Sequence, residues 1–191
     1  MKKILLIIVF LLGIIFADQF PIDRENCMIT KINGFNYIVL SSAYNSWRND
    51  HNYTGLHRAY DIPCKNGTTF RAARDGRVKE VAYGYTHEQV DGTWRTNYGN
   101  YVIIKQLNGE SQLYAHAEKI CVRENEEIAE GEMLGRVGST GLVDKWGRQI
   151  IAPHLHYEFR NIYGEKINPG SFWDLPKDEY HHCFTVLDQN K

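Results

Sequence analysis

Two histidines separated by one residue are the part of this sequence best suited to chemistry. Residues 153–159 read Pro-His-Leu-His-Tyr-Glu-Phe and alternate polar with apolar side chains, as a half-buried β-strand does. His154, His156 and Glu158 then share one face, with the two imidazoles roughly 7 Å apart. Because imidazole nitrogen binds zinc and accepts protons near neutral pH, this face indicates a metal site with one histidine bound and one free to act. An exposed strand face is the alternative. Glu158 could orient one imidazole as a hydrogen-bond acceptor, or be a solvated carboxylate.

His57 and Asp61 offer two more zinc donors, a neutral nitrogen and an anionic oxygen. Their spacing would suit one face of a helix, but Pro63 follows closely and residues 59–62 look extended. We therefore expect both residues at the entry to a strand, brought together by a bend. Chance exposure at the surface is the alternative for this pair.

His116 ends a third strand-like run, residues 113–118. The alternative to a functional role is a partly buried histidine hydrogen-bonded to a backbone carbonyl. Tyr114 lies two residues earlier, so on a regular strand it shares the face of His116 and could donate to an oxyanion. A packed core tyrosine is the alternative.

In their order along the chain, these segments resemble the lysostaphin/LytM-type (M23) zinc metallopeptidases. Residues 55–63 resemble the family's His-x-Gly-x-Asp ligand segment, with Ala59 where the family usually has Gly. The other matching segments are a hairpin (67–78), two central strands (99–104 and 114–116) and the closing segments (131–141 and 153–158). The likeness runs from about Ser42 to Trp173.

The resemblance implies that His57, Asp61 and His156 hold Zn²⁺. Three protein ligands leave one coordination position open, as catalytic zinc sites do. The resemblance also puts His154 and His116 beside the water that the metal activates. There a neutral imidazole accepts a proton, and an imidazolium stabilises an oxyanion or protonates the leaving amine. The sequence does not divide these roles between the two histidines.

The body of the chain is expected to be mainly β. Charged residues alternate with β-branched ones and glycines recur at turn spacing, which predicts one domain of antiparallel sheets; the resemblance adds a groove. Short helical turns are expected at residues 24–29 and 169–175, and an insertion between two strands at residues 86–97. Trp94, Tyr98 and Tyr101 could line a peptide or glycan groove, or pack in the core.

The first residues predict an exported protein. Two lysines precede an apolar run that is too short for an ordinary transmembrane helix, so residues 1–17 are expected to be a signal peptide, with an uncleaved anchor as the alternative. After cleavage we expect no stable membrane insertion and a periplasmic or secreted location. We divide the remainder into an N-terminal segment that packs on or covers the domain (18–44), the peptidase domain (45–175) and a tail (176–191).

Four cysteines follow the predicted signal, and an even number in an exported chain indicates disulfides. We favour Cys64–Cys121, because both residues precede similar hairpins, and Cys27–Cys183, which would tie the ends together. Free buried thiols are the alternative.

These features predict a zinc endopeptidase that cuts peptide cross-links or stem peptides of bacterial peptidoglycan. One alternative is a non-catalytic, zinc-containing cell-wall binding or regulatory protein; the presence of both His116 and His154 argues against it, because a pure binder does not need them. A secreted zinc protease that acts on proteins is a third class. With 22 basic and 23 acidic residues, the chain offers no general basic patch for nucleic acid.

Overall fold

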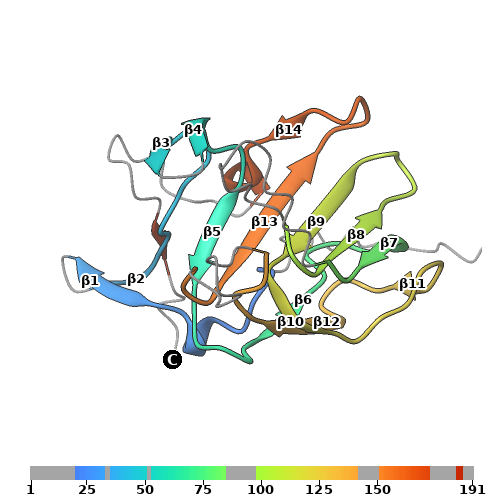
Figure 1. Ribbon diagram of the computed structural model, residues 1–191, viewed down its shortest axis with the longest axis horizontal. Coiled ribbons are helices and arrows are strands. Elements are labelled where there is room, and N and C mark those ends of the chain that lie inside the picture. The colour runs from blue at the N-terminus through green and yellow to red at the C-terminus, as the bar shows by residue number, and fades with distance from the viewer. Residues whose placement is uncertain are drawn as a thin grey trace, which may run out of the picture.

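The computed structural model describes residues 20–32, 35–50, 53–84, 98–141, 151–172 and 184–186. Within these residues the chain forms β-strands and two short 3₁₀ helices, and every strand pair is antiparallel. The prediction of a mainly antiparallel β fold is confirmed (Figure 1).

The main sheet has seven strands among the described residues, and β13 (His154–Arg160) is its central member. Along one edge β13 pairs with β9 (Ser111–Ala115), and along the other it pairs with β5 (Tyr60–Pro63) and β14 (Lys166–Ile167). The sheet continues from β9 through β8 (Tyr101–Lys105) and β7 (Gly76–Ala82) to β11 (Glu127–Ile128). Strands from three distant parts of the chain therefore meet at β13.

Three smaller sheets surround this one. The first contains β10 (Ala117–Ile120), β12 (Met133–Val137) and β6 (Thr69–Arg71) in that order. The second contains β1 (Ile29–Ile32), β2 (Phe35–Val39) and β15 (Phe184–Val186), and the third is the hairpin of β3 (Trp47–Asp50) and β4 (Tyr53–Leu56).

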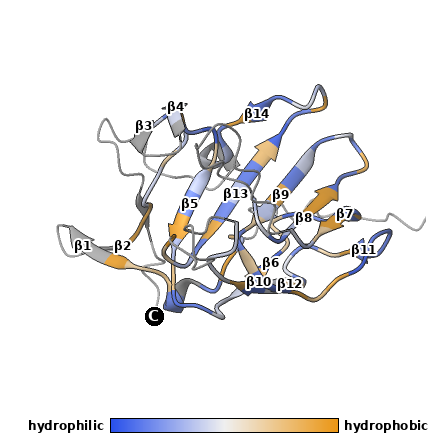
Figure 2. Ribbon diagram, viewed as in Figure 1, coloured by the Kyte–Doolittle hydropathy of each residue, from blue (hydrophilic) through white to orange (hydrophobic). Residues whose placement is uncertain are grey.

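The alternation expected for β13 decides which of its faces is buried in the core. Leu155, Tyr157 and Phe159 are 0%, 1% and 1% exposed, and they pack in one cluster with side chains such as Phe70 and Leu134 of the β10–β12–β6 sheet. In Figure 2, hydrophilic colour accordingly runs along the middle of β13, with hydrophobic colour toward its end. Because successive side chains point to opposite faces, the histidines of this strand are displayed on the face away from the core.

The described part of the N-terminal segment packs on the domain. Phe20 and Ile22 are each 2% exposed and belong to the main hydrophobic cluster. Ile22 forms an antiparallel bridge with Phe70, and the backbone N–H of Arg71 donates to the carbonyl of Pro21. Residues 20–22 are therefore an integral part of the fold.

Both predicted helical turns are present in the described residues. The first, η1 (Arg24–Asn26), ends early because β1 begins at Ile29, and the second, η2 (Pro169–Phe172), ends at the limit of the described residues. In the described part of the chain, no helix is both long and apolar enough to cross a membrane. The predicted signal peptide, the 86–97 insertion with Trp94, and most of the tail lie outside the described residues.

The predicted Cys64–Cys121 disulfide is wrong, because both residues are free thiols. Cys64 lies at the end of β5 and faces Cys27 across an antiparallel bridge, whereas Cys121 follows β10 on another sheet and is exposed. The similar local sequences that follow Cys64 and Cys121 therefore do not mean that the two cysteines lie close together in space. The other predicted pair involves Cys183, which lies outside the described residues.

Candidate active site

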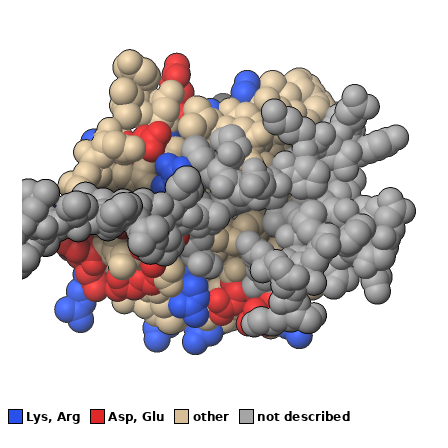
Figure 3. Space-filling view, turned by 180° about the vertical axis from the view of Figure 1, so that it is seen from behind, with Lys and Arg blue, Asp and Glu red and all other residues tan. Residues whose placement is uncertain are grey.

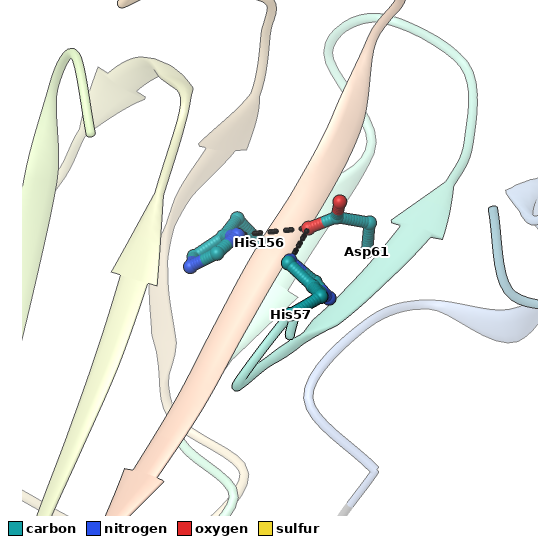
Figure 4. Close-up of side chains that lie close together, drawn as sticks. All are labelled: His57, Asp61 and His156. Atoms are coloured by element: carbon teal, nitrogen blue, oxygen red, sulfur yellow. Dashed lines mark hydrogen bonds and ion pairs between the residues drawn. The ribbon is translucent and has the colours of Figure 1, made fainter. Parts of the chain in front are cut away.

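The register of two neighbouring strands brings the three predicted metal ligands together. His156 on β13 pairs directly with Asp61 on β5, and the chain bends at Ala59, just before β5, so that His57 points to the same place. Asp61 Oδ1 lies 2.8 Å from His156 Nδ1 and 3.3 Å from His57 Nε2 (Figure 4). One donor atom from each residue lies within 4.8 Å of the others.

Each of the three side chains has two polar atoms, and one of them contacts a group outside the cluster. His57 Nδ1 lies 3.4 Å from the carbonyl oxygen of Ala43, and Arg48 Nη1 donates to Asp61 Oδ2 at 3.0 Å. His156 Nε2 lies 3.1 Å from Glu158 Oε1. Such outer partners fix the tautomer and orientation of metal ligands. The remaining atoms, His57 Nε2, Asp61 Oδ1 and His156 Nδ1, face one another.

This donor set fits Zn²⁺. When His57 Nδ1–H donates to Ala43, Nε2 carries a lone pair, and that buried nitrogen makes no hydrogen bond within the described structure. A lone pair that faces an anionic carboxylate oxygen at 3.3 Å calls for a cation between them. Two imidazole nitrogens and one carboxylate oxygen are typical ligands of catalytic zinc.

His116 and His154 lie beside this triad. Their ring centroids are 4.7 Å apart, the rings of His116 and His156 are 5.5 Å apart, and His154 Nε2 lies 3.8 Å from Asp61 Oδ1. His116 Nδ1 is 2.7 Å from the carbonyl oxygen of Thr140, and His154 Nδ1 is 2.8 Å from that of Ala152. A carbonyl accepts only, so Nδ1 of each ring carries the proton and Nε2 carries the lone pair.

His116 takes a backbone conformation that is rare for a residue other than glycine. Its φ is +63°, in the left-handed region, and its N–H and C=O bond to Tyr98 and Gly138 respectively. Strained conformations of this kind persist only where the surroundings hold them, and they cluster at functional sites. The conformation also ends β9 at Ala115, so the strand alternation does not extend to His116.

Tyr114 consequently lies outside the histidine cluster. Its ring is fully buried and stacks on Phe70, and its hydroxyl accepts from the N–H of Ala73 at 2.8 Å and donates to Gln112 at 2.5 Å. The idea that Tyr114 shares the face of His116 is therefore wrong, and the structure has the alternative, a packed core tyrosine.

Burial and charge give these groups different protonation tendencies. Burial lowers the pKa of His116 to about 3 and also lowers that of His154, so both rings are neutral near pH 7. Burial opposes a charge on His156 too, but its hydrogen bonds to Asp61 and Glu158 raise its pKa to about 9 in the absence of metal. Burial would raise the pKa of Asp61, yet the hydrogen bond from His156 and the neighbouring imidazoles hold it well below its ordinary value in the absence of metal.

Several contacts at the site were not foreseen from the sequence. Arg48 reaches Asp61 from the β3–β4 hairpin, and Lys166 and Arg160 reach Glu158. Of these, only Arg160 carries a local signal, since it follows Glu158 by two residues on the same face of β13. Tyr98, expected to line a groove or pack in the core, donates its hydroxyl proton to Glu158 at 2.6 Å. The hydroxyl of Tyr101 donates to Glu80.

Acidic and basic side chains both gather along the lower edge of the face shown in Figure 3.

Comparison with known proteins places these features in a family. The family model described as peptidase family M23 matches residues 55–169, more than half of the chain. The DD-carboxypeptidase/endopeptidase Mpg of Neisseria meningitidis is 32% identical over 162 residues, which cover 78% of this chain and 31% of that protein. The peptidoglycan DD-endopeptidase ShyC of Vibrio cholerae is 32% identical over 141 residues (72% and 28%). The murein hydrolase activator NlpD of Escherichia coli is 31% identical over 115 residues (60% and 25%).

Solved structures share the fold. A zinc-containing peptidase from Vibrio cholerae superposes with a TM-score of 0.56 at 19% identity, covering 80% of this chain and 38% of that one. The catalytic domain of lysostaphin from Staphylococcus simulans superposes with a TM-score of 0.55 at 21% identity, covering 71% and 91%. The chain spans about a third or less of the length of the curated relatives it matches. From the family match, which contains the whole histidine cluster, we conclude that this chain belongs to peptidase family M23.

Proposed function

We propose that this chain is an exported zinc metalloendopeptidase that hydrolyses peptide bonds in peptidoglycan cross-links or stem peptides. The observation that carries the proposal is the pair of neutral imidazoles, His116 and His154, beside a triad of metal donors. The relatives named as an endopeptidase and as a peptidoglycan endopeptidase support the choice of substrate. The apolar run after Lys3 supports export.

His57, Asp61 and His156 would hold Zn²⁺. When bound, the ion supplies Lewis acidity toward a water molecule and toward the scissile carbonyl. The protein contributes orientation, because the outer hydrogen bonds of the three side chains fix their donor atoms before any substrate arrives.

The two free imidazoles would handle protons. Nε2 of His116 and of His154 carries a lone pair, so either nitrogen can accept the proton of an attacking water. The resulting imidazolium can stabilise negative charge on the carbonyl oxygen or return the proton to the leaving amine. His116 lies deeper, at 5% exposed, and His154 is nearer the surface, which favours contact of His154 with the substrate.

A non-catalytic role is the second candidate, and one observation favours it: the likeness to a protein named as a murein hydrolase activator. Such a role requires a binding surface but no proton-transfer groups. The strained backbone of His116 argues for catalysis. A positive φ at a histidine has an energetic cost, and a protein that only binds the cell wall has no need of a histidine held in that conformation.

Digestion of isolated peptidoglycan tests the proposal. The purified protein is incubated with the polymer in the presence of one equivalent of zinc, after removal of metal by a chelator, and after zinc is restored. Soluble products are identified by mass spectrometry. We expect fragments with new peptide termini in both zinc-containing samples and none in the chelated sample, and the termini identify the bond that is cut.

A parallel reaction separates the two candidates. It adds a purified murein hydrolase of low basal activity to the same polymer. The protein is an activator, and the endopeptidase proposal fails, if two results are found together. The protein alone releases no fragments, and it accelerates release by the second enzyme equally with zinc and with chelator.

A further inference from the structure

Glu158 is a fully buried carboxylate with polar contacts on both oxygens. Oε1 lies 3.1 Å from His156 Nε2, 2.6 Å from Lys166 Nζ and 2.6 Å from the hydroxyl of Tyr98. Oε2 accepts from Arg160 Nη2 at 2.7 Å and from Arg160 Nε at 3.1 Å. The residue is 0% exposed, whereas the side chains of His154 and His156 on the same face of β13 are 14% and 12% exposed. Burial of a charged group is unfavourable unless it is paired, so this arrangement requires its cations.

The two cations are themselves arranged around the carboxylate. Arg160 and Lys166 are directly opposite one another in the β13–β14 pair. Like charges in that position repel, and here Glu158 lies between them and compensates both. The side chains of Lys166 and Arg160 are 35% and 26% exposed, so they reach from the surface inward to Glu158.

Among the contacts of Glu158 within the described residues, the one with His156 reaches a proposed metal ligand directly. The imidazole of His156 faces Asp61 with Nδ1 and Glu158 with Nε2. A metal needs a lone pair on Nδ1, and the neutral ring then has its proton on Nε2. The carboxylate oxygen of Glu158 lies 3.1 Å from Nε2 and can accept a hydrogen bond from that proton, so its position favours this tautomer.

We propose that Lys166 is a positioning residue for the metal centre: with Arg160 it holds the Glu158 carboxylate in place, with Oε1 toward Nε2 of His156, so that Nδ1 of that ring faces the metal. Tyr98 supports the same geometry, since its hydroxyl binds Glu158 and its ring lies 5.5 Å from the ring of His156. The inference rests on the proposed zinc site and extends it to a residue on β14 that touches neither the metal ligands nor the catalytic histidines.

Zinc affinity, measured without substrate, tests the inference. Metal-free protein is titrated with zinc in competition with a chromophoric chelator at pH 7, for the wild type and for Lys166→Met, Lys166→Arg and Glu158→Gln. Removal of a hydrogen-bond partner behind a metal ligand typically weakens metal binding by about 10- to 100-fold. We expect Lys166→Met and Glu158→Gln to weaken zinc binding by at least about 10-fold, and Lys166→Arg to stay within about 3-fold of the wild type.

A matched control excludes a general effect of lost charge. Lys119 is an exposed lysine on β10, and we expect Lys119→Met to bind zinc as the wild type does. A second readout is the Nε2–H resonance of His156 in zinc-loaded, ¹⁵N-labelled protein. It is expected to be protected from exchange in the wild type and to exchange faster in Lys166→Met. If Lys166→Met does not fold, as judged by circular dichroism, Lys166→Ala, which also removes the donor to Glu158, replaces it.

The outcomes separate this inference from the proposed function. If Lys166→Met binds zinc as tightly as the wild type and its Nε2–H is equally protected, Lys166 is a surface residue and the positioning role is wrong, while the zinc site stands. If the wild type itself binds no zinc, the proposed function fails and the positioning role fails with it.

Discussion

At the scale of single residues, each histidine ring of the site is held by a hydrogen bond from one of its two nitrogens to a group outside the cluster. Each histidine of the cluster uses one ring nitrogen to bond a group outside it: Ala43 for His57, Thr140 for His116, Ala152 for His154 and Glu158 for His156. Because the outer nitrogen is occupied, the inner one is available without reorganisation. These side chains are therefore oriented by the protein before a metal or substrate binds.

The ligand assignment predicts a sharp loss of metal when one donor is removed. His57→Ala deletes the buried nitrogen that has no hydrogen bond in the described structure, and leaves two donors, which are too few for a stable zinc site. Elemental analysis after dialysis should show about one zinc per chain in the wild type and almost none in His57→Ala. His154→Ala is the control and should keep its zinc. Full occupancy in His57→Ala would show that the ligand set is different.

At the scale of elements, close backbone contacts hold His116 in place. Gly99 has a φ of +60°, and a Cβ on it would lie 2.4 Å from the carbonyl carbon of Thr140 and 2.6 Å from the nitrogen of Gly141. The same Thr140 carbonyl accepts from His116 Nδ1, and the N–H of His116 donates to Tyr98. The position of His116 is thus set by how tightly residues 98–100 pack on residues 140–141.

Two glycine substitutions separate this packing from simple backbone strain. Gly99→Ala must displace backbone atoms and is expected to lower the free energy of unfolding by about 2–4 kcal/mol and to reduce turnover, since Thr140 shifts away from His116. Gly164→Ala also places alanine at a positive φ, +81°, but meets no atom within 4 Å, so it should cost only about 1 kcal/mol and leave turnover unchanged. Urea unfolding and peptidoglycan digestion measure both effects. Equal losses in the two variants would refute the packing role.

The strands also show how much of the site could be predicted from the sequence. The shared face of His154, His156 and Glu158 follows from strand alternation, which is local, and the structure has it. The same rule failed for Tyr114 because the positive φ of His116 interrupts the strand, and nothing in the local sequence announces it. The contact of Lys166 with Glu158 depends on strand register between β13 and β14, which the pattern alone does not fix.

At the scale of the whole molecule, distant parts of the chain share one core. The main cluster joins Phe20 and Ile22 of the N-terminal segment to Phe70 on the small sheet and to Leu155 on β13. Arg71 adds an ion pair with Asp23 at 2.9 Å. Cysteine pairing could not be deduced from the sequence, because it depends on which strands of the whole molecule meet in space. The sequence left open whether residues 18–44 pack on the domain or cover its groove, and the core contacts of residues 20–22 favour packing.

Shortening one side chain of this segment tests that conclusion. Phe20→Ala removes a ring that is 2% exposed and should lower the free energy of unfolding by about 3–5 kcal/mol, which corresponds to a melting temperature lower by roughly 10 °C. Met28→Ala, at a side chain that is 56% exposed, should change stability by less than about 0.5 kcal/mol. Thermal unfolding measures both. An increase in the specific activity of Phe20→Ala with unchanged stability would instead indicate an inhibitory segment.

The most direct test of the account is a comparison of His116→Ala with the wild type at equal zinc content. Both proteins are loaded to one zinc per chain, and the release of peptide fragments from peptidoglycan is followed over time. His116 contributes no metal ligand in the proposed site, so the variant should keep its zinc; it should also lose at least about 100-fold in turnover, the usual contribution of a general acid or base. Wild-type turnover in His116→Ala would remove His116 from the mechanism, and loss of zinc from the variant would contradict the division of the cluster into ligands and proton-transfer groups.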